Sequence, residues 1–264
     1  MNRIEEKFNE LRRENKKAFI PYITAGDPSL SVTEKLVFEL EKRGASLIEL
    51  GVPFSDPLAD GPTIQKAGER SLKNGTTLTR IVNLVRKIRG KVKIPICLMT
   101  YYNPIYRYGL SKFAEDSSVA GVDGVIISDL PPEEAKEWVK FARKKNIATI
   151  FLLSPVSNYD RIELVKKVSR GFIYYVSLTG VTGERDKLDP SIKNIITRIK
   201  KTVNLPICVG FGISKRKHIE ELCKLPIDGV IVGSAIVKVI ENSGKSSNVI
   251  KKAGDFVTGL IKAM

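Results

Sequence analysis

A single glutamate interrupts one of the apolar segments of this 264-residue sequence. Glu49 lies within residues 47–52 (LIELGV), whose aliphatic composition is typical of a buried strand. Side chains alternate between the two faces of a strand, so Glu49 shares a face with Leu47 and Gly51. An apolar setting disfavours the carboxylate and raises its pKa into the range of a general acid or base. The alternative is a structural core glutamate, paired with a buried base or hydrogen-bonded there.

The next segment carries two more carboxylates. Residues 53–62 (PFSDPLADGP) place Asp56 and Asp60 in a proline-rich loop that leads into a helix at Thr63. Carboxylates beside Glu49 would supply what acid/base catalysis requires. Aspartate also caps helices and forms turns with proline and glycine, so each of the two has a purely structural alternative.

Three glycine-containing segments lie late in the chain: residues 179–183 (TGVTG), 210–214 (GFGIS) and 233–235 (GSA). Glycine lets backbone amides approach a ligand closely. Ser234 is expected to begin a short helix, whose N-terminus would attract an anion. Turn formation explains any single glycine, but the three segments together predict a phosphate site.

The elements that must position these residues alternate regularly. Segments rich in β-branched residues recur eight times, at residues 18–24, 47–52, 94–101, 124–128, 148–154, 172–177, 206–212 and 229–235. Segments with helical periodicity separate them, which predicts parallel strands joined by right-handed crossovers. Eight such units favour a closed (β/α)8 TIM barrel, with a doubly wound open sheet as the alternative.

In a barrel, the C-terminal ends of the strands carry the active site, and Glu49 would point into the barrel mouth. An extra N-terminal helix over residues 2–15 is expected to plug the bottom, and the last helix runs from about Ser247 to the end. No composition break divides the chain, so we expect one domain over residues 1–264. The similarity of residues 122–128 (VDGVIIS) to residues 227–234 (IDGVIVGS) is repetition of a strand type.

Composition excludes several classes of function. The formal net charge is +15, but the basic residues are spread along the chain without interleaved aromatics, which argues against nucleic-acid binding and leaves a surface that favours anionic substrates. No segment is apolar enough to span a membrane and the N-terminus is charged, so we expect a cytoplasmic protein. His218, the only histidine, and the three cysteines, Cys97, Cys208 and Cys223, lack metal-ligand spacing, so no metal is expected.

Six segments, in order along the chain, closely resemble the tryptophan synthase alpha family. They are residues 21–28 (PYITAGDP), 49–65 (ELGVPFSDPLADGPTIQ), 99–105 (MTYYNPI), 129–134 (DLPPEE), 177–183 (SLTGVTG) and 209–213 (VGFGI). The resemblance implies a lyase of tryptophan biosynthesis that cleaves indole-3-glycerol phosphate to indole and glyceraldehyde 3-phosphate. The resemblance also implies that Glu49 corresponds to the principal acid/base of the family and Asp60 to the acceptor of the indole N–H.

The resemblance also implies how the substrate is bound. Tyr22, Leu98 and Leu153 would line the indole pocket, with Tyr174 near the substrate. Gly183, Gly212, Gly233 and Ser234 would bind the phosphate, Phe211 and Ile213 lie within that anion loop, and Thr182 would be the hinge of a lid. Tyr22 departs from the phenylalanine frequent in the family.

The same resemblance implies a partner. This chain would need no cofactor and would pair with a beta subunit that carries pyridoxal phosphate, in an α2β2 complex that passes indole between the subunits. Residues 53–62 and 101–109 would form the docking surface. Two alternatives are an indole-3-glycerol phosphate synthase, which would need a strand lysine where only Lys93 lies at an edge, and a subunit that mainly activates its partner.

Overall fold

Parallel strands form the centre of the molecule. The computed structural model describes residues 1–176, 191–210, 212–244 and 246–264. The strands found there are β1 (Ala18–Thr24), β2 (Ile48–Gly51), β3 (Ile96–Thr100), β4 (Gly124–Ile127), β5 (Ala148–Ile150), β6 (Leu152–Leu153), β7 (Ile173–Val176), β8 (Ile207–Gly210) and β9 (Gly229–Val232). All of their pairings are parallel, as the alternation of strands and helices predicts.

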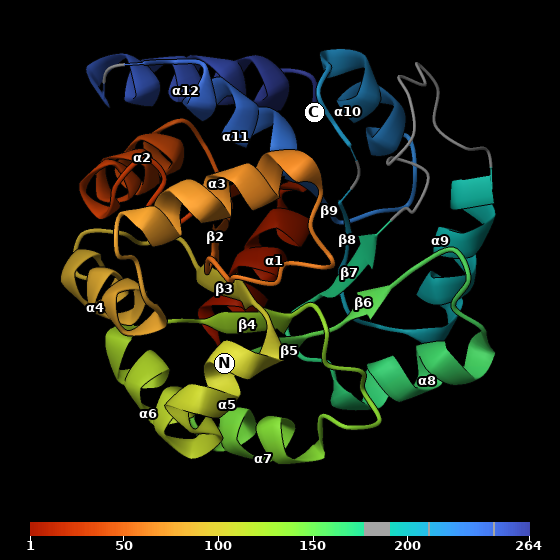
Figure 1. Cartoon of the computed structure of the whole chain (residues 1–264). Helices are drawn as coiled ribbons and strands as arrows, with labels where there is room; N and C mark the ends of the chain where they lie inside the picture. The colour runs from red at the N-terminus through yellow and green to blue at the C-terminus, as the bar shows by residue number, and fades with distance from the viewer. Residues whose placement is uncertain (177–190, 211, 245) are drawn as a thin grey trace.

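The order of the strands closes the sheet into a barrel. It runs β5-β4-β3-β2-β1-β9-β8-β7-β6, and only Phe151 separates β5 from β6, the two strands at its ends. The carbonyl of Phe151 accepts a 3.1 Å hydrogen bond from the N–H of Tyr174, which continues the pairing across the break. The two short strands are therefore the halves of the fifth predicted strand. The (β/α)8 barrel is confirmed and the open sheet is excluded (Figure 1).

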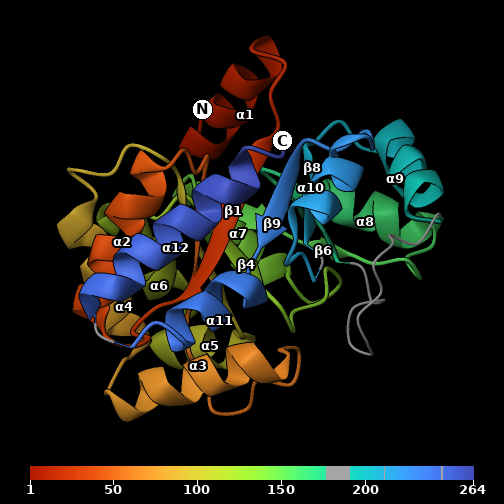
Figure 2. The same ribbon diagram turned by 90° about the horizontal axis from the view of Figure 1, so that it is seen from above.

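Helices surround this barrel and cover one of its ends (Figures 1 and 2). They are α1 (Arg3–Arg13), α2 (Leu30–Lys42), α3 (Pro62–Lys73), α4 (Leu78–Ile88), α5 (Tyr102–Tyr108), α6 (Leu110–Ala120), α7 (Lys136–Lys144), α8 (Tyr159–Val168), α9 (Ser191–Thr202), α10 (Arg216–Cys223), α11 (Ser234–Glu241) and α12 (Ser246–Ile261). Ser29, Thr77 and Asn158 start their helices by accepting a hydrogen bond from a first-turn N–H.

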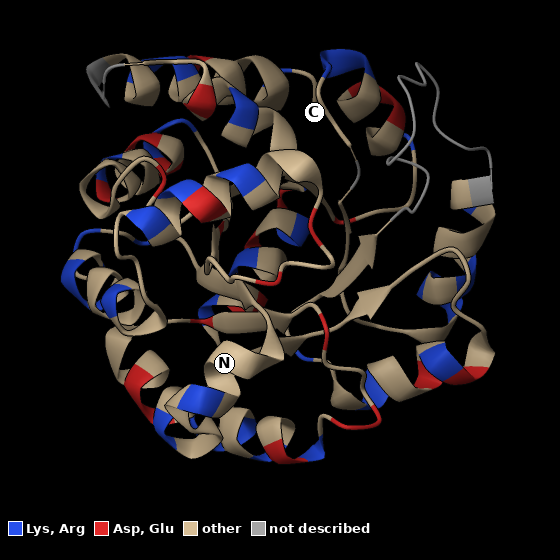
Figure 3. Ribbon diagram, in the orientation of Figure 1, with Lys and Arg blue, Asp and Glu red and all other residues tan. Residues whose placement is uncertain are grey.

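The outer faces of the helices carry the charge. Basic and acidic residues are interspersed around the ring (Figure 3), which agrees with the spread of basic residues along the sequence. Within the described part of the chain, no helix combines the length and the apolar character that crossing a membrane would require.

The strands separate two apolar layers. Outward-facing residues such as Ile48 and Leu50 pack against the helices. Inward-facing residues, among them Leu47, form a second cluster together with Ile4 and Phe8 of α1. Figure 2 shows α1 at the end of the barrel opposite α3 and α5. The N-terminal helix therefore plugs the bottom of the barrel, as expected.

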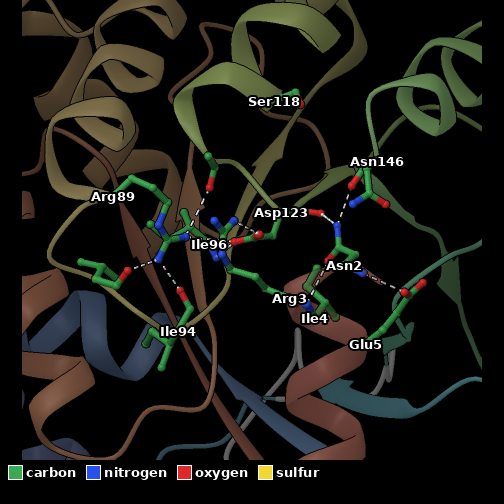
Figure 4. Close-up of polar contacts among 12 residues, drawn as sticks. Asn2, Arg3, Ile4, Glu5, Arg89, Ile94, Ile96, Ser118, Asp123 and Asn146 are labelled. Carbon is green, nitrogen blue, oxygen red and sulfur yellow. Dashed lines mark hydrogen bonds and ion pairs between the residues drawn. The ribbon is translucent and has the colours of Figure 1, made fainter.

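A buried aspartate secures this plug. Asp123, only 3% exposed, accepts hydrogen bonds from Arg3 at 2.8 Å, Arg89 at 3.0 Å and the N–H of Ile96 at 2.9 Å (Figure 4). Its backbone carbonyl also accepts a 2.8 Å hydrogen bond from the Asn2 side chain, which caps α1. One carboxylate thus joins α1, the end of α4 and the start of β3.

The second copy of this sequence pattern builds the same arrangement on the other side of the barrel. Asp228 accepts a 2.7 Å hydrogen bond from the N–H of Ile207. It also forms an ion pair with Lys200, near the end of α9. The carboxylate again joins the end of a helix to the start of the strand that follows it. The similarity seen in the sequence therefore marks a repeated structural unit, and not merely a strand type.

We expect Asp123→Ala to lower the free energy of unfolding by about 3 kcal/mol, because Arg89 and the buried N–H of Ile96 lose their acceptor. Urea denaturation would measure the change. Arg3→Ala is the control. The Arg3 side chain is 49% exposed where it pairs with Asp123, so its loss should lower the free energy of unfolding by less than about 1 kcal/mol. Equal losses in the two variants would contradict this role of Asp123.

Candidate active site

A cavity of about 1510 Å³ opens at the C-terminal ends of the strands. This is the end at which (β/α)8 barrels carry their active sites. The predicted site residues that border it are Asp60, Tyr22, Leu153, Tyr174, Gly212, Gly233 and Ser234. The fold therefore brings together residues from the first, second, fifth, sixth, seventh and eighth strand units.

Glu49 lies below the floor of this cavity. Its side chain is 0% exposed, and neither carboxylate oxygen has a hydrogen-bond partner among the described residues. Burial raises the pKa of Glu49 to about 8, and no basic group contributes to the shift. The expected elevation is present, and the alternative of a glutamate paired with a buried base is excluded within the described chain.

The position of Glu49 differs from the expectation that it points into the barrel mouth. Glu49 does not border the cavity, whereas Tyr22, its partner in the strand register, does. A Cβ atom at Gly51 would overlap the Tyr22 hydroxyl. The missing side chain of Gly51 therefore lets the Tyr22 ring lie across the interior, one layer above the carboxylate.

A second tyrosine covers the same layer. A Cβ atom at Gly210 would overlap the Tyr174 ring and hydroxyl, so this glycine makes room for Tyr174 as Gly51 does for Tyr22. Burial, followed by the charge of the nearby Glu49, raises the pKa of the Tyr174 phenol well above its ordinary value. Tyr22 and Tyr174 thus keep neutral hydroxyl groups close to the carboxyl group of Glu49, which has no hydrogen-bond partner among the described residues.

Asp60 lies in the wall of the cavity, at the start of α3. The side-chain amide of Gln65 donates to its backbone carbonyl at 2.8 Å. The Tyr101 hydroxyl accepts a 3.0 Å hydrogen bond from the N–H of Ala59 and donates to the Asp60 carboxylate. Burial raises the pKa of Asp60, and the hydrogen bond from Tyr101 opposes the rise. Sequence reasoning placed Tyr101 only in the docking surface and gave Gln65 no role.

The opposite wall is suited to an anion. Helix α11 begins at Ser234, as predicted, and no side chain caps its first turn. The N–H groups of a first turn have no partner within the helix, and Gly233 and Ser234 at the start of this helix border the cavity. Thr182, Gly183 and Phe211 lie outside the described residues.

Two of the predicted substrate-binding residues do not border the cavity. Leu98 and Ile213 are buried in the layer between strands and helices and do not border the cavity. In β3 the inward positions are Cys97 and Met99, and Met99 borders the cavity where Leu98 was expected. Because this strand is apolar on both faces, its sequence does not reveal which face is inward. Leu153 does border the cavity, although its side chain belongs to the outer layer.

The described residues contain no group of three or more potential metal ligands among His, Cys, Asp and Glu. His218 is half-buried in α10, and its Nδ1 atom lies 3.5 Å from the N–H of Ser214. It does not border the cavity. The arrangement supports proton transfer by a buried carboxyl group beside a second carboxyl group and an anion site.

The raised pKa of Glu49 makes stability depend on pH. Between its ordinary value of 4.5 and about 8, the folded chain keeps a proton that the unfolded chain has lost, so the contribution of Glu49 to stability falls as pH rises through this window. We expect Glu49→Gln and the wild-type chain to have similar free energies of unfolding near pH 5. Above about pH 8 the variant should be more stable by on the order of 4 kcal/mol. Urea denaturation at several pH values tests this, and a difference independent of pH would contradict it.

Comparison with known proteins agrees with this geometry. The family model of the tryptophan synthase alpha chain matches residues 8–263. The alpha chain of Geotalea daltonii is 51% identical over 93% of this chain and 93% of its own length, and that of Geobacter sulfurreducens is 47% identical over 100% and 99%.

Solved structures are similar too. The alpha subunit of tryptophan synthase from Legionella pneumophila superposes with a TM-score of 0.93 at 37% identity, over 100% of this chain and 98% of that chain. A chain from a structure of the tryptophan synthase α2β2 complex of Pyrococcus furiosus gives 0.88 at 41% identity, over 93% and 98%. This chain therefore belongs to the tryptophan synthase alpha chain family.

Proposed function

We propose that this chain cleaves indole-3-glycerol phosphate to indole and glyceraldehyde 3-phosphate, a step of tryptophan biosynthesis. Membership of the family supports the reaction. The observation that carries the proposal is Glu49, a buried carboxyl group whose pKa is raised to about 8 beside a cavity that Asp60 borders. Such a group holds its proton at neutral pH and can donate it.

The chemistry requires both carboxyl groups. Indole C3 is a poor leaving carbanion, so Glu49 first protonates C3 and turns the ring into an electron acceptor. The carboxylate of Asp60 stabilises the positive charge that develops at N1. The carboxylate of Glu49 then takes the proton of the 3′-hydroxyl group, the carbon–carbon bond breaks, and its electrons return to the ring. Glu49 ends protonated again, so the cycle uses no metal or organic cofactor in this chain.

The buried position of Glu49 adds one requirement. Its carboxyl group lies one layer below the cavity, under Tyr22 and Tyr174. The side chain must therefore rotate upwards to reach the substrate. The absence of strong partners for its oxygens keeps the cost of this rotation low.

The two walls of the cavity divide the substrate between them. We assign the indole ring to Tyr22, Leu153, Tyr174 and Asp60, and the phosphate to Gly212, Gly233 and Ser234. Thr182 as a lid hinge, Gly183 as a phosphate ligand and Phe211 within the anion loop stay predictions from the resemblance. A single domain over residues 1–264 and a cytoplasmic location stay predictions from the composition of the sequence.

A beta subunit is the partner, in an α2β2 complex like the one named for the Pyrococcus furiosus relative. In that pairing the beta subunit holds the pyridoxal phosphate. The docking surface that we propose includes the tip of residues 53–62, where Leu58 is 94% exposed and Asp56 is also exposed. Apolar exposure of this extent marks an interaction site when it belongs to a larger surface. We assign Tyr106 of α5, which is 64% exposed, to the same docking surface.

Glu49→Gln keeps the shape of the side chain and removes its exchangeable proton. We expect turnover of indole-3-glycerol phosphate to fall by at least about 100-fold, with substrate binding retained. Release of glyceraldehyde 3-phosphate from the purified chain, with and without a beta subunit, measures this. Near-normal turnover in the variant would remove Glu49 from the chemistry. A wild-type chain inactive alone but stimulating its partner would support the activating role instead.

The phosphate assignment predicts losses of affinity of different size for two variants of similar shape. A side chain at Gly212 would meet no described atom within 4 Å, so it would extend into open space. Gly212→Asp should weaken binding of glycerol phosphate by roughly 10-fold or more through charge repulsion. Gly212→Asn, similar in shape but neutral, should weaken it much less. Equal affinities of the two variants in calorimetry would argue against an anion at this position.

A further inference from the structure

Two neighbouring helices direct their N-termini at the cavity. Helix α3 begins at Pro62, directly after Asp60 and Gly61, and helix α11 begins at Ser234. Asp60 and Ser234 both border the cavity. The two helices pack against each other, as Figures 1 and 2 show. The distance between the acid at one end of the cavity and the anion site at the other is therefore set by how α3 lies against α11.

Asp60 is attached firmly to α3. Gln65, in the first turn of α3, donates from its side-chain amide to the carbonyl of Asp60 at 2.8 Å and to that of Pro57 at 3.4 Å. Its backbone N–H donates to the carbonyl of Gly61 at 3.0 Å. A shift of α3 would therefore carry Asp60 with it.

Arg70, further along α3, binds two carboxylates at once. Its Nε and Nη2 atoms donate to the two oxygens of Asp27 at 2.9 and 2.8 Å. Its Nη1 atom donates to Glu241, the last residue of α11, at 2.7 Å. Asp27 is 3% exposed, and it lies in the turn that follows β1. One guanidinium group thus joins the barrel, α3 and α11.

The same turn holds α3 closely to the barrel. The Ser71 hydroxyl donates to the carbonyl of Ala25 at 2.6 Å. Gly26 has a φ of +87°, and a Cβ atom there would overlap the side chains of Ser71 and Thr76. With this end of α3 fixed to the turn, the pair between Arg70 and Glu241 links α11 to that fixed end.

We propose that Arg70 is a positioning residue that fixes the separation between Asp60 and the N-terminus of α11, and so between the indole and phosphate ends of the substrate. This inference rests on the proposed function. A ligand that binds both ends gains affinity from their linkage only when the separation of the two sites matches its length. Lysine cannot replace the planar fork of arginine, because one ammonium group cannot bind Asp27 through two parallel hydrogen bonds while it reaches Glu241.

Three ligands separate positioning from general damage. Indole-3-propanol phosphate spans both ends and cannot be cleaved, whereas indole and glycerol 3-phosphate each occupy one end. In Arg70→Lys we expect the affinity for the spanning ligand, measured by calorimetry, to fall about 10-fold while the affinities for the two fragments change less than about twofold. Glu241→Gln, which leaves the pair between Arg70 and Asp27 in place, should weaken the spanning ligand by about threefold.

A matched control exists elsewhere in the chain. Arg43, at the C-terminal end of α2, also binds two carboxylates, Glu39 and Asp255 of α12, but no residue of α2 or α12 borders the cavity. Arg43→Lys should leave the affinity for all three ligands unchanged.

The outcomes are distinct. An unchanged affinity for the spanning ligand in both Arg70→Lys and Glu241→Gln, or an equal loss for all three ligands, would overturn the positioning role while the proposed function stands. Failure of the unchanged chain to bind the spanning ligand or to cleave indole-3-glycerol phosphate would overturn the proposed function, and the role of Arg70 with it.

Discussion

The exclusion of water and of counter-charges from the barrel interior is the constraint on which the site depends. From below, Ile4 and Phe8 of α1 fill the end of the barrel. From above, Tyr22 and Tyr174 lie between Glu49 and the cavity. Burial alone accounts for the raised pKa of Glu49, and a water-filled or open barrel bottom would remove that cause. The plug helix is therefore connected to the chemistry, although it lies at the far end of the barrel.

The two ends of the barrel are built with opposite uses of carboxylates. At the bottom, Asp123 and Asp228 each accept a backbone hydrogen bond and bind at least one cationic side chain, and each joins a helix to a strand. In the upper half, Glu49 has no partner among the described residues, and Asp60 is partly buried beside a tyrosine hydroxyl. A paired carboxylate contributes stability, whereas an unpaired buried one costs stability and gains reactivity.

Glycine determines the shape of the layer between these two ends. Gly51 and Gly210 stand where a side chain would overlap Tyr22 and Tyr174. A Cβ atom at Gly233 would lie 3.4 Å from the Tyr22 ring, so this ring lies close to the start of α11. The tyrosine that covers Glu49 thus also contacts the anion wall, so the two functional halves of the cavity share one side chain.

Local patterns determined much of this protein, because strand and helix periodicity are properties of short segments. The sequence alone predicted the eight strand units, the plug helix, the inward face of Glu49 and the helix start at Ser234. Tertiary structure decided which face of the largely apolar segment 94–101 is inward, so Met99 borders the cavity where Leu98 was expected.

Closure of the barrel decided the rest. It broke the fifth strand at Phe151 and placed Glu49 beneath Tyr22 and not in the mouth. The bridge of Arg70 to Asp27 and Glu241 joins residues that are 43 and 171 positions apart. No periodicity encodes such contacts, because they exist only once the first and last strands lie side by side and their helices pack around them.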